Sequence, residues 1–134
     1  MLAFVELITR DLILKFLKFG LVGFSGVFVD FTTTFIFKEW FKVQRFVSNA
    51  IGFTIAATSN YYLNRIWTFE SHNPRVMVEF GQFFLISMIG LGINTLIIWI
   101  LDRKFQFNFY VAKLVAIGVV TIWNFIANSY ITFA

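Results

Sequence analysis

The chain contains four long apolar runs, and their length limits its fold more than any other feature. They cover residues 20–37, 46–63, 80–101 and 109–132. An α-helix rises about 1.5 Å per residue, so a run of 18 residues reaches roughly 27 Å, close to the ~30 Å hydrocarbon core of a bilayer. Each run is therefore long enough to cross a membrane as a helix.

The composition favours the same environment. Hydrophobic residues make up 59% of the 134 residues and charged residues only 13%, whereas a soluble domain is roughly 25% charged. The net charge of +4 raises the question of a nucleic-acid partner, but the positive charges form short clusters between the apolar runs. Such clusters suit anionic lipid headgroups. We therefore expect a protein that contacts membrane lipids and binds no nucleic acid.

Short connections predict an all-α membrane protein with four transmembrane helices, because they force consecutive helices to lie antiparallel. In residues 2–18 the charges of Asp11, Lys15 and Lys18 share one helix side, which predicts an interfacial helix leading into the first span. Aromatic residues that favour the membrane boundary fall near the span ends. They are Trp40, Trp67, Tyr110 and Tyr130.

A shift of 64 residues aligns the two halves of the chain. The matched pairs are Phe16 with Phe80, Phe19 with Phe83, Gly26 with Gly90, Asp30 with Asn94, Asn60 with Asn124, Asn64 with Asn128, Thr68 with Thr132, and Phe69 with Phe133. The pattern predicts two helical hairpins within a single domain of residues 1–134, one over about 12–70 and one over about 76–134. An even number of spans in each half would make the repeats parallel.

Rows of small and then polar residues follow one side of the second and fourth helices. They are Ser48, Gly52, Ala56, Asn60 and Asn64, and Ala112, Ala116, Val120, Asn124 and Asn128. Small residues let helices approach closely, and asparagine can hydrogen-bond between them. Two compatible interpretations follow: the rows are packing seams, or they line a polar groove for a ligand headgroup.

Charged residues inside or beside the spans are further candidates. Asp30 lies well within the first run, where a carboxylate must be protonated, bonded to a hydroxyl such as Thr33 or Thr34, or paired with a cation. Lys113 is the cation we expect for such a pair, because it begins the fourth run on the same membrane side as the end of the first. It also precedes Asn124 by about three helical turns and so shares its helix face. The alternative is that Lys113 extends to the headgroups.

Arg65 and Trp67 close the second run, and Lys15 and Lys18 lie on the same membrane side. The planar donor fork of arginine suits phosphate, so Lys18 and Arg65 are candidate phosphate ligands. An ordinary interfacial anchor is the alternative.

The sequence carries no cysteine, no phosphate-binding glycine loop and one histidine without metal-ligand spacing. It therefore predicts no catalytic residue, no metal and no cofactor.

The segments "FLKFGLVGFSGVFVDF" (residues 16–31), "SNYYLNRIWTF" (59–69) and "VAKLVAIGVVTIWNFIANSYITF" (111–133) resemble the GtrA-like family of small four-span membrane proteins. The resemblance covers essentially the whole chain. One departure is that the second hairpin ends with Ser129 and Ile131 where the first has Arg65 and Trp67. A role that needs two symmetric arginines would therefore fall to Arg65 alone.

The resemblance implies a flippase for a polyprenyl-phosphate-linked monosaccharide, serving cell-surface polysaccharide or teichoic-acid glycosylation. It also implies the cytoplasmic membrane and favours both termini on the cytoplasmic side. Because the positive charges on the two sides nearly balance, a dual-topology antiparallel dimer is the alternative. A non-transporting subunit that positions a glycosyltransferase is the alternative, and a small proton-coupled exporter using Asp30 is a third. The expected partners are the sugar lipid, a glycosyltransferase and, because four helices enclose little space, further copies of the chain.

Overall fold

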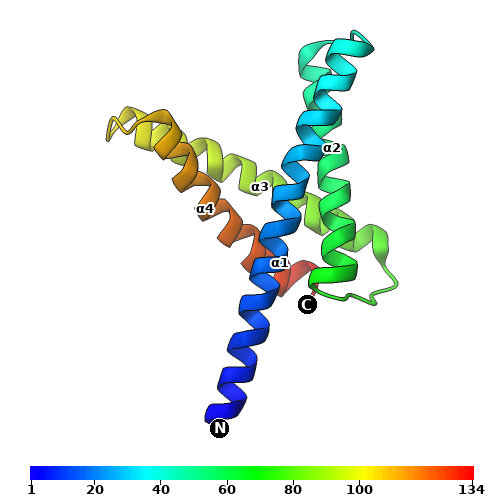
Figure 1. Ribbon diagram of the computed structural model, residues 1–134, viewed down its shortest axis with the longest axis vertical. Helices are drawn as coiled ribbons and strands as arrows, with labels where there is room; N and C mark the ends of the chain where they lie inside the picture. The colour runs from blue at the N-terminus through cyan, green and yellow to red at the C-terminus, as the bar shows by residue number, and fades with distance from the viewer. The chain divides into compact units, whose positions relative to one another are not determined.

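The computed structural model describes residues 1–134, except for the side chains of Phe109 and Tyr110. The predicted all-α fold is confirmed (Figure 1). The helices in chain order are α1 (Leu2–Phe35), η1 (Ile36–Trp40), α2 (Arg45–Leu63), η2 (Asn64–Thr68), α3 (Val76–Arg103), α4 (Phe109–Ala127) and η3 (Asn128–Thr132), where η marks a single π-helical turn.

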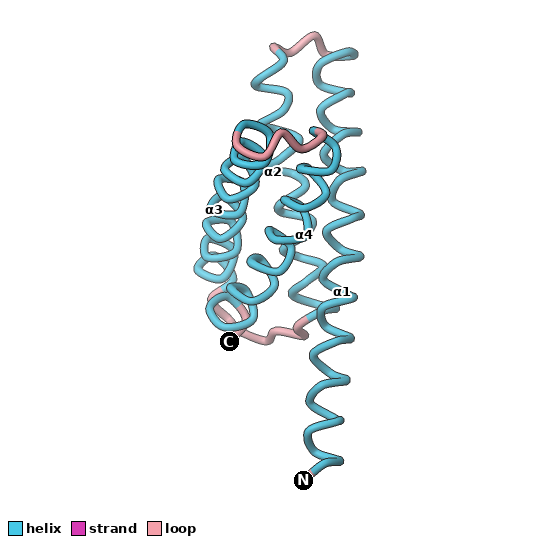
Figure 2. Tube along the Cα trace, turned by 90° about the vertical axis from the view of Figure 1, so that its left-hand side faces the viewer, coloured by secondary structure: helices cyan, strands magenta, loops and turns pink.

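The chain forms two compact units, Met1–His72 and Asn73–Ala134. In the first, α1 packs against α2, and in the second, α3 packs against α4. Short loops join the two helices of each unit, so that the partners run antiparallel (Figure 2). Each unit is thus a helical hairpin, called here the first and the second hairpin.

Helix α1 includes residues 2–18, where the sequence predicts an interfacial helix leading into the first span. The helix is continuous from Leu2 to Phe35, and its amino-terminal part extends past the end of α2 (Figure 1). The segment contains no proline to interrupt the hydrogen bonds between successive turns, so the helix continues into the first span, and the interfacial location of residues 2–18 stays a prediction. Residues 1–14 are exposed.

Among the residues that the structure describes, three helical segments are long and apolar enough to cross a membrane: Leu2–Trp40, Val76–Arg103 and Val111–Thr132. Helix α2 is not among them because serine, threonine and asparagine side chains lower its hydropathy. It nevertheless has the same length as α4, 19 residues, and the same π-helical extension of 5 residues. Since α2 packs against α1, its polar side chains are partly covered by its partner.

The two hairpin loops share a left-handed residue and a closing hydrogen bond at equivalent positions. Lys42 and Gln106, which are 64 residues apart, adopt φ angles of 56° and 54°. After each of them an amide closes the loop: Val43 N donates to Phe37 O at 2.9 Å, and Phe107 N donates to Leu101 O at 3.0 Å. The repeat seen in the sequence therefore extends to the backbone of the turns.

The end of each hairpin opposite its loop, called here the open end, is held by an equivalent aromatic contact. Buried Phe19 packs edge-on against Phe69 with ring centroids 6.3 Å apart, and buried Phe83 packs in the same way against Phe133 at 6.3 Å. Edge-to-face packing of this kind is the favoured geometry for aromatic rings. Each contact joins the first helix of its hairpin, α1 or α3, to the residue just past the π-helical turn at the end of the second helix.

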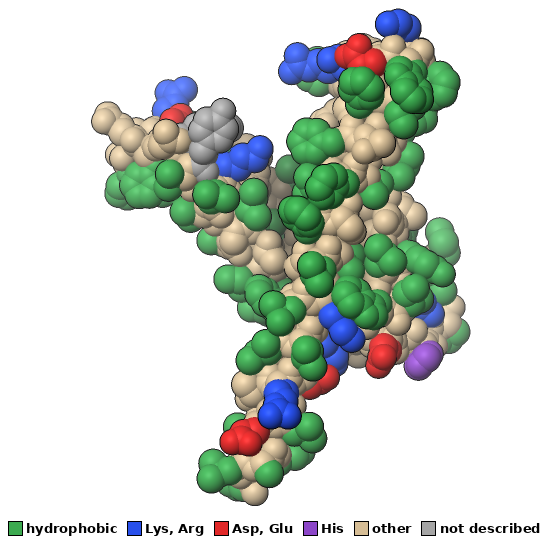
Figure 3. Space-filling model, viewed as in Figure 1, with side chains coloured by type: hydrophobic (Ala, Val, Ile, Leu, Met, Phe, Trp, Pro, Cys, Tyr) green, Lys and Arg blue, Asp and Glu red, His purple; other side chains and the backbone are tan. Residues whose placement is uncertain are grey.

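Large apolar side chains remain exposed along the hairpins, and charged groups gather toward the helix ends and along the amino-terminal part of α1 (Figure 3). Trp40, Trp67 and Tyr130 are exposed and lie in the terminal turns η1, η2 and η3. This distribution is typical of a surface that faces lipid and of aromatic residues at its boundary. The Tyr110 ring, expected at another span end, lies outside the described side chains.

Candidate ligand-binding site

Each hairpin ends in the same buried hydrogen bond. Thr68 Oγ1 donates to Asn64 Oδ1 at 2.7 Å, and Thr132 Oγ1 donates to Asn128 Oδ1 at 2.7 Å. All four side chains are buried. The π-helical turn contains both partners of each pair, so the bond ties the first residue of the turn to its last. Asn64 and Asn128, predicted as ligand residues, therefore have a structural partner within their own turn.

The other asparagine pair, Asn60 and Asn124, differs in its bonding. Among the side chains that the structure describes, the Oδ1 atoms of both residues are buried without any hydrogen-bond partner. Each amide lies against a glycine of the facing helix: a Cβ added to Gly26 would collide with the Asn60 amide, and one added to Gly90 would lie 2.8 Å from Asn124 Oδ1. Both hairpins thus hold an unused acceptor against a glycine of the facing helix.

The two rows of small residues have the burial expected of packing seams. Ser48, Ala112 and Ala116 are fully buried.

Lys113 is exposed, although its neighbour Ala112 is fully buried. The buried side of α4 at this level therefore passes through Ala112 and Ala116 and not through Lys113. A ligand role for Lys113 stays a prediction.

Asp30 accepts a hydrogen bond from Thr34 Oγ1 at 3.2 Å, one of the hydroxyl partners predicted for it. A Cβ added to Gly52 of α2 would collide with the Thr34 hydroxyl and lie 2.7 Å from Asp30 Oδ1. The carboxylate is therefore half-buried at the α1–α2 contact. The pairing of Asp30 with Lys113, which belongs to the second hairpin, also stays a prediction.

The open end of the first hairpin carries the predicted cations. Lys18 Nζ lies 5.4 Å from the centre of the Trp67 ring, a cation–π distance, and Arg65 is half-buried in the same turn, η2. Lys15, by contrast, pairs with Asp11 at 3.2 Å. The equivalent positions of the second hairpin hold Gln82, Ser129 and Ile131. This cationic end is therefore present in only one of the two repeats.

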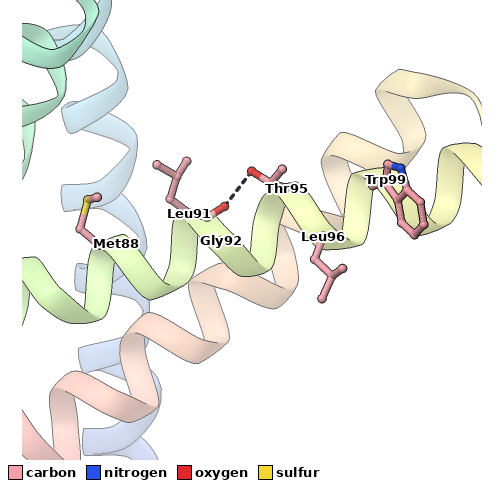
Figure 4. Close-up of a pocket in the computed structure, with 6 residues that line it drawn as sticks. All are labelled: Met88, Leu91, Gly92, Thr95, Leu96 and Trp99. Atoms are coloured by element: carbon pink, nitrogen blue, oxygen red, sulfur yellow. Dashed lines mark hydrogen bonds between the residues drawn. The ribbon is translucent and has the colours of Figure 1, made fainter.

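A shallow cavity on α3 is lined mainly by apolar side chains, unlike the cationic end of the first hairpin (Figure 4). It is lined by Met88, Leu91, Gly92, Thr95, Leu96 and Trp99. Its hydroxyl, Thr95 Oγ1, donates to Leu91 O of its own helix at 3.0 Å. No charged side chain lines it, so it offers neither a phosphate ligand nor a free hydroxyl donor to a sugar.

Two features of the hairpins were missed by sequence reasoning. Trp123 Nε1 donates to Ile86 O at 3.2 Å and so joins α4 to α3. A polar cavity lined by Lys38 and Arg45 lies at the loop end of the first hairpin. The spacing of Lys38 and Arg45 across a short loop was a usable signal, because such a loop brings the flanking residues of both helices together.

These features define a membrane protein of paired helical hairpins, with asparagine seams in both hairpins and a cationic end on one. The chain belongs to the GtrA/DPMS family: that family's transmembrane domain matches residues 18–133. It is 22% identical over 116 residues to the "Uncharacterized membrane protein YwcD" of Bacillus subtilis (strain 168), a match that covers 84% of this chain and 91% of the relative.

Family membership supports a role in the translocation of polyprenyl-phosphate sugars or in glycosylation. The family is generally non-catalytic. In the part of the chain that the structure describes, no group of three or more His, Cys, Asp or Glu residues is arranged to hold a metal.

Proposed function

We propose that this protein translocates a polyprenyl-phosphate-linked monosaccharide across the cytoplasmic membrane, for cell-surface polysaccharide or teichoic-acid glycosylation. The observation that carries the proposal is the pair of buried, unpartnered oxygens of Asn60 and Asn124. An unsatisfied buried acceptor costs roughly 1–3 kcal/mol. Two such acceptors at equivalent positions suit a ligand that supplies hydroxyl donors, as a sugar does.

The phosphate of the carrier would engage the open end of the first hairpin. Lys18 is held over Trp67, and arginine at position 65 adds a second cation in the adjacent helical turn. Charge-assisted hydrogen bonds to phosphate are about twice as strong as neutral ones. The isoprenoid chain needs no polar site, since the exposed apolar surface of the hairpins faces the lipid. Asp30 and Lys113 would serve the sugar at the other boundary.

The proposal includes an orientation with both termini in the cytoplasm, which puts Lys18 and Arg65 where the carrier is loaded. The chain has no cysteine, so single cysteines report orientation directly. His72→Cys should be labelled by a membrane-impermeant maleimide only after the cell is opened. Gln106→Cys, in the loop of the second hairpin, should be labelled on intact spheroplasts. The reverse pattern would contradict the orientation.

The experiment that tests transport uses the purified protein alone in liposomes containing a polyprenyl-phosphate-linked hexose. An external reagent that oxidises the sugar measures how much of the inner-leaflet pool becomes accessible. We expect accessibility above that of empty liposomes, and loss of the gain in Asn60→Ala with Asn124→Ala. Thr58→Ala is the matched control, because Thr58 is exposed on α2 and bonds only within its helix.

No movement by the folded wild-type protein would contradict a transporter that acts alone. The same preparation with added glycosyltransferase then tests the accessory role. Co-purification with that enzyme, without lipid movement, would identify a subunit that positions it.

A homo-oligomer is also part of the proposal, and the mass of the detergent-solubilised protein checks it.

A further inference from the structure

The loop end of the first hairpin contains a polar cavity that the proposed function does not use. It is lined by Thr34, Lys38, Arg45, Phe46 and Asn49. Its volume of about 310 Å³ is at the lower end of the roughly 300–1,000 Å³ typical of small-molecule pockets. The lining comes from the end of α1, from η1 and from the first turns of α2. Lys and Arg side chains gather at this tip of the hairpin (Figure 3).

The lining has the donors that an anion with several oxygens requires. Lys38 and Arg45 supply two positive charges, and Asn49 adds an amide. The Arg45 guanidinium lies 5.4 Å from the Phe46 ring centre, a cation–π contact that positions it at the rim. Helix α2 begins at Arg45, so the positive end of its dipole adds to the field.

The negative groups near the cavity are already engaged. Glu39 pairs with Lys38 at 3.4 Å, and both side chains are about half exposed, so that pair is weak and easily exchanged. Asp30 accepts the Thr34 hydroxyl and does not line the cavity. An anion that replaced Glu39 as the partner of Lys38 would also reach Arg45.

The second hairpin does not reproduce this arrangement. The positions equivalent to Thr34, Lys38 and Asn49 hold Ile98, Asp102 and Lys113. A basic tip suits the anchoring of a hairpin in headgroups, and the second hairpin has one as well, with Arg103 and Lys104. The first tip adds a cavity that two of its cations, Lys38 and Arg45, line together.

We propose that this cavity binds a phosphate ester group, at the end of the first hairpin opposite to Lys18 and Arg65. The inference goes beyond the proposed function, because a protein that moves no lipid could still hold a phosphate there. The phosphate could belong to a phospholipid headgroup, to a polyprenyl carrier or to a soluble phosphate. All three present the same oxygens to Lys38 and Arg45.

Native mass spectrometry of the detergent-purified full chain tests the proposal. The probes are phosphatidylglycerol and undecaprenyl phosphate, with diacylglycerol and undecaprenol as phosphate-free baselines and inorganic phosphate as a competitor. Lys38→Gln with Arg45→Gln should weaken binding of the phosphate lipids about tenfold or more, the factor expected for one lost charge-assisted hydrogen bond. Glu39→Gln should strengthen it several-fold, because the competing carboxylate is removed.

Lys104→Gln is the matched control, since Lys104 is an exposed cation at the loop end of the second hairpin. Equal weakening for both lipids supports a site for any lipid phosphate, and weakening for undecaprenyl phosphate alone supports a carrier site. Displacement by inorganic phosphate at equal concentration supports a soluble ligand. Wild-type binding by Lys38→Gln with Arg45→Gln, or an equal loss in Lys104→Gln, overturns the proposal. Stronger phosphate-lipid binding by Glu39→Gln cannot come from misfolding, so it supports the site independently of any binding lost in the double variant. Because this assay measures binding only, its result does not depend on whether the protein transports lipid.

Discussion

Asparagines one helical turn apart at the end of each hairpin differ in what their side-chain oxygens contact. Asn64 and Asn128 accept a threonine hydroxyl inside a π-helical turn, whereas Asn60 and Asn124 present buried oxygens without a described partner. The first pair stabilises the helix end. The second pair costs stability and is the better candidate for ligand contact.

Asn64→Ala should destabilise the protein, because it leaves the buried Thr68 hydroxyl without its acceptor. We expect a loss of about 1–2 kcal/mol, the usual cost of a broken buried hydrogen bond, and the same for Asn128→Ala. Thermal unfolding in detergent, followed by circular dichroism, measures it. Thr58→Ala should change the melting temperature little, and an equally small effect of Asn64→Ala would contradict the structural role.

The sequence predicted the asparagine positions through the repeat, and the threonines of the same repeat were a usable signal for this difference in bonding. Both pairs lie on the same row of the same helix, with the same residue type. Asn64 and Asn128 each have a threonine four residues later on the same helix side, whereas the residue four after Asn60 and after Asn124 is another asparagine. Which oxygen stays unpaired depends on how closely Gly26 or Gly90 approaches.

At the scale of elements, the close approach of α1 and α2 depends on two glycines. Asp30 O of the α1 backbone lies 2.8 Å from the place a Cβ would take at Gly52, while only the Asn60 side chain blocks a Cβ at Gly26. A side chain can turn aside more easily than a backbone can move. Gly52 is therefore the less replaceable of the two.

Gly52→Ala should lower stability by roughly 1–3 kcal/mol, the usual cost of overpacking a close contact. Gly26→Ala should cost less. Gly23→Ala is the control, since nothing lies within 4 Å of a Cβ added there, and alanine favours helix. The melting temperatures of the three variants rank their stabilities. A Gly52→Ala variant as stable as Gly23→Ala would rule out the close contact of Gly52 with the α1 backbone.

The helices themselves could be predicted from the apolar runs and from the loops between them. The continuous α1 could not, because charges at Asp11, Lys15 and Lys18 indicate an interfacial segment without indicating where the backbone would bend. The π-helical ends were also unpredictable. They differ from α-helix by one residue in the hydrogen-bond spacing and carry no residue type that requires it.

At the scale of the whole molecule, two hairpins with the same turns and terminal contacts differ in charge. The first has Lys18, Arg65 and Trp67 at its open end, where the second has Gln82, Ser129 and Ile131. The cationic end therefore belongs to only one copy of the duplicated architecture. The sequence predicted this asymmetry, and the structure adds the contact of Lys18 with Trp67.

Replacing the first end by the second tests that asymmetry. The variant Lys18→Gln, Arg65→Ser, Trp67→Ile should fold, because these residues fit the equivalent positions of the second hairpin. We expect its lipid translocation in liposomes to fall tenfold or more, consistent with about 1.4 kcal/mol or more of lost phosphate binding. Unchanged translocation by this folded variant would exclude the cationic end from the function.

The rate of sugar-lipid translocation by Asn60→Ala with Asn124→Ala, measured together with its stability, tests the central claim most directly. Removing two unpartnered oxygens should leave the melting temperature near that of the wild type while the translocation rate falls at least tenfold, the equivalent of about 1.4 kcal/mol. A variant that transports normally, or one that loses transport only because it unfolds, would contradict a ligand role for these asparagines.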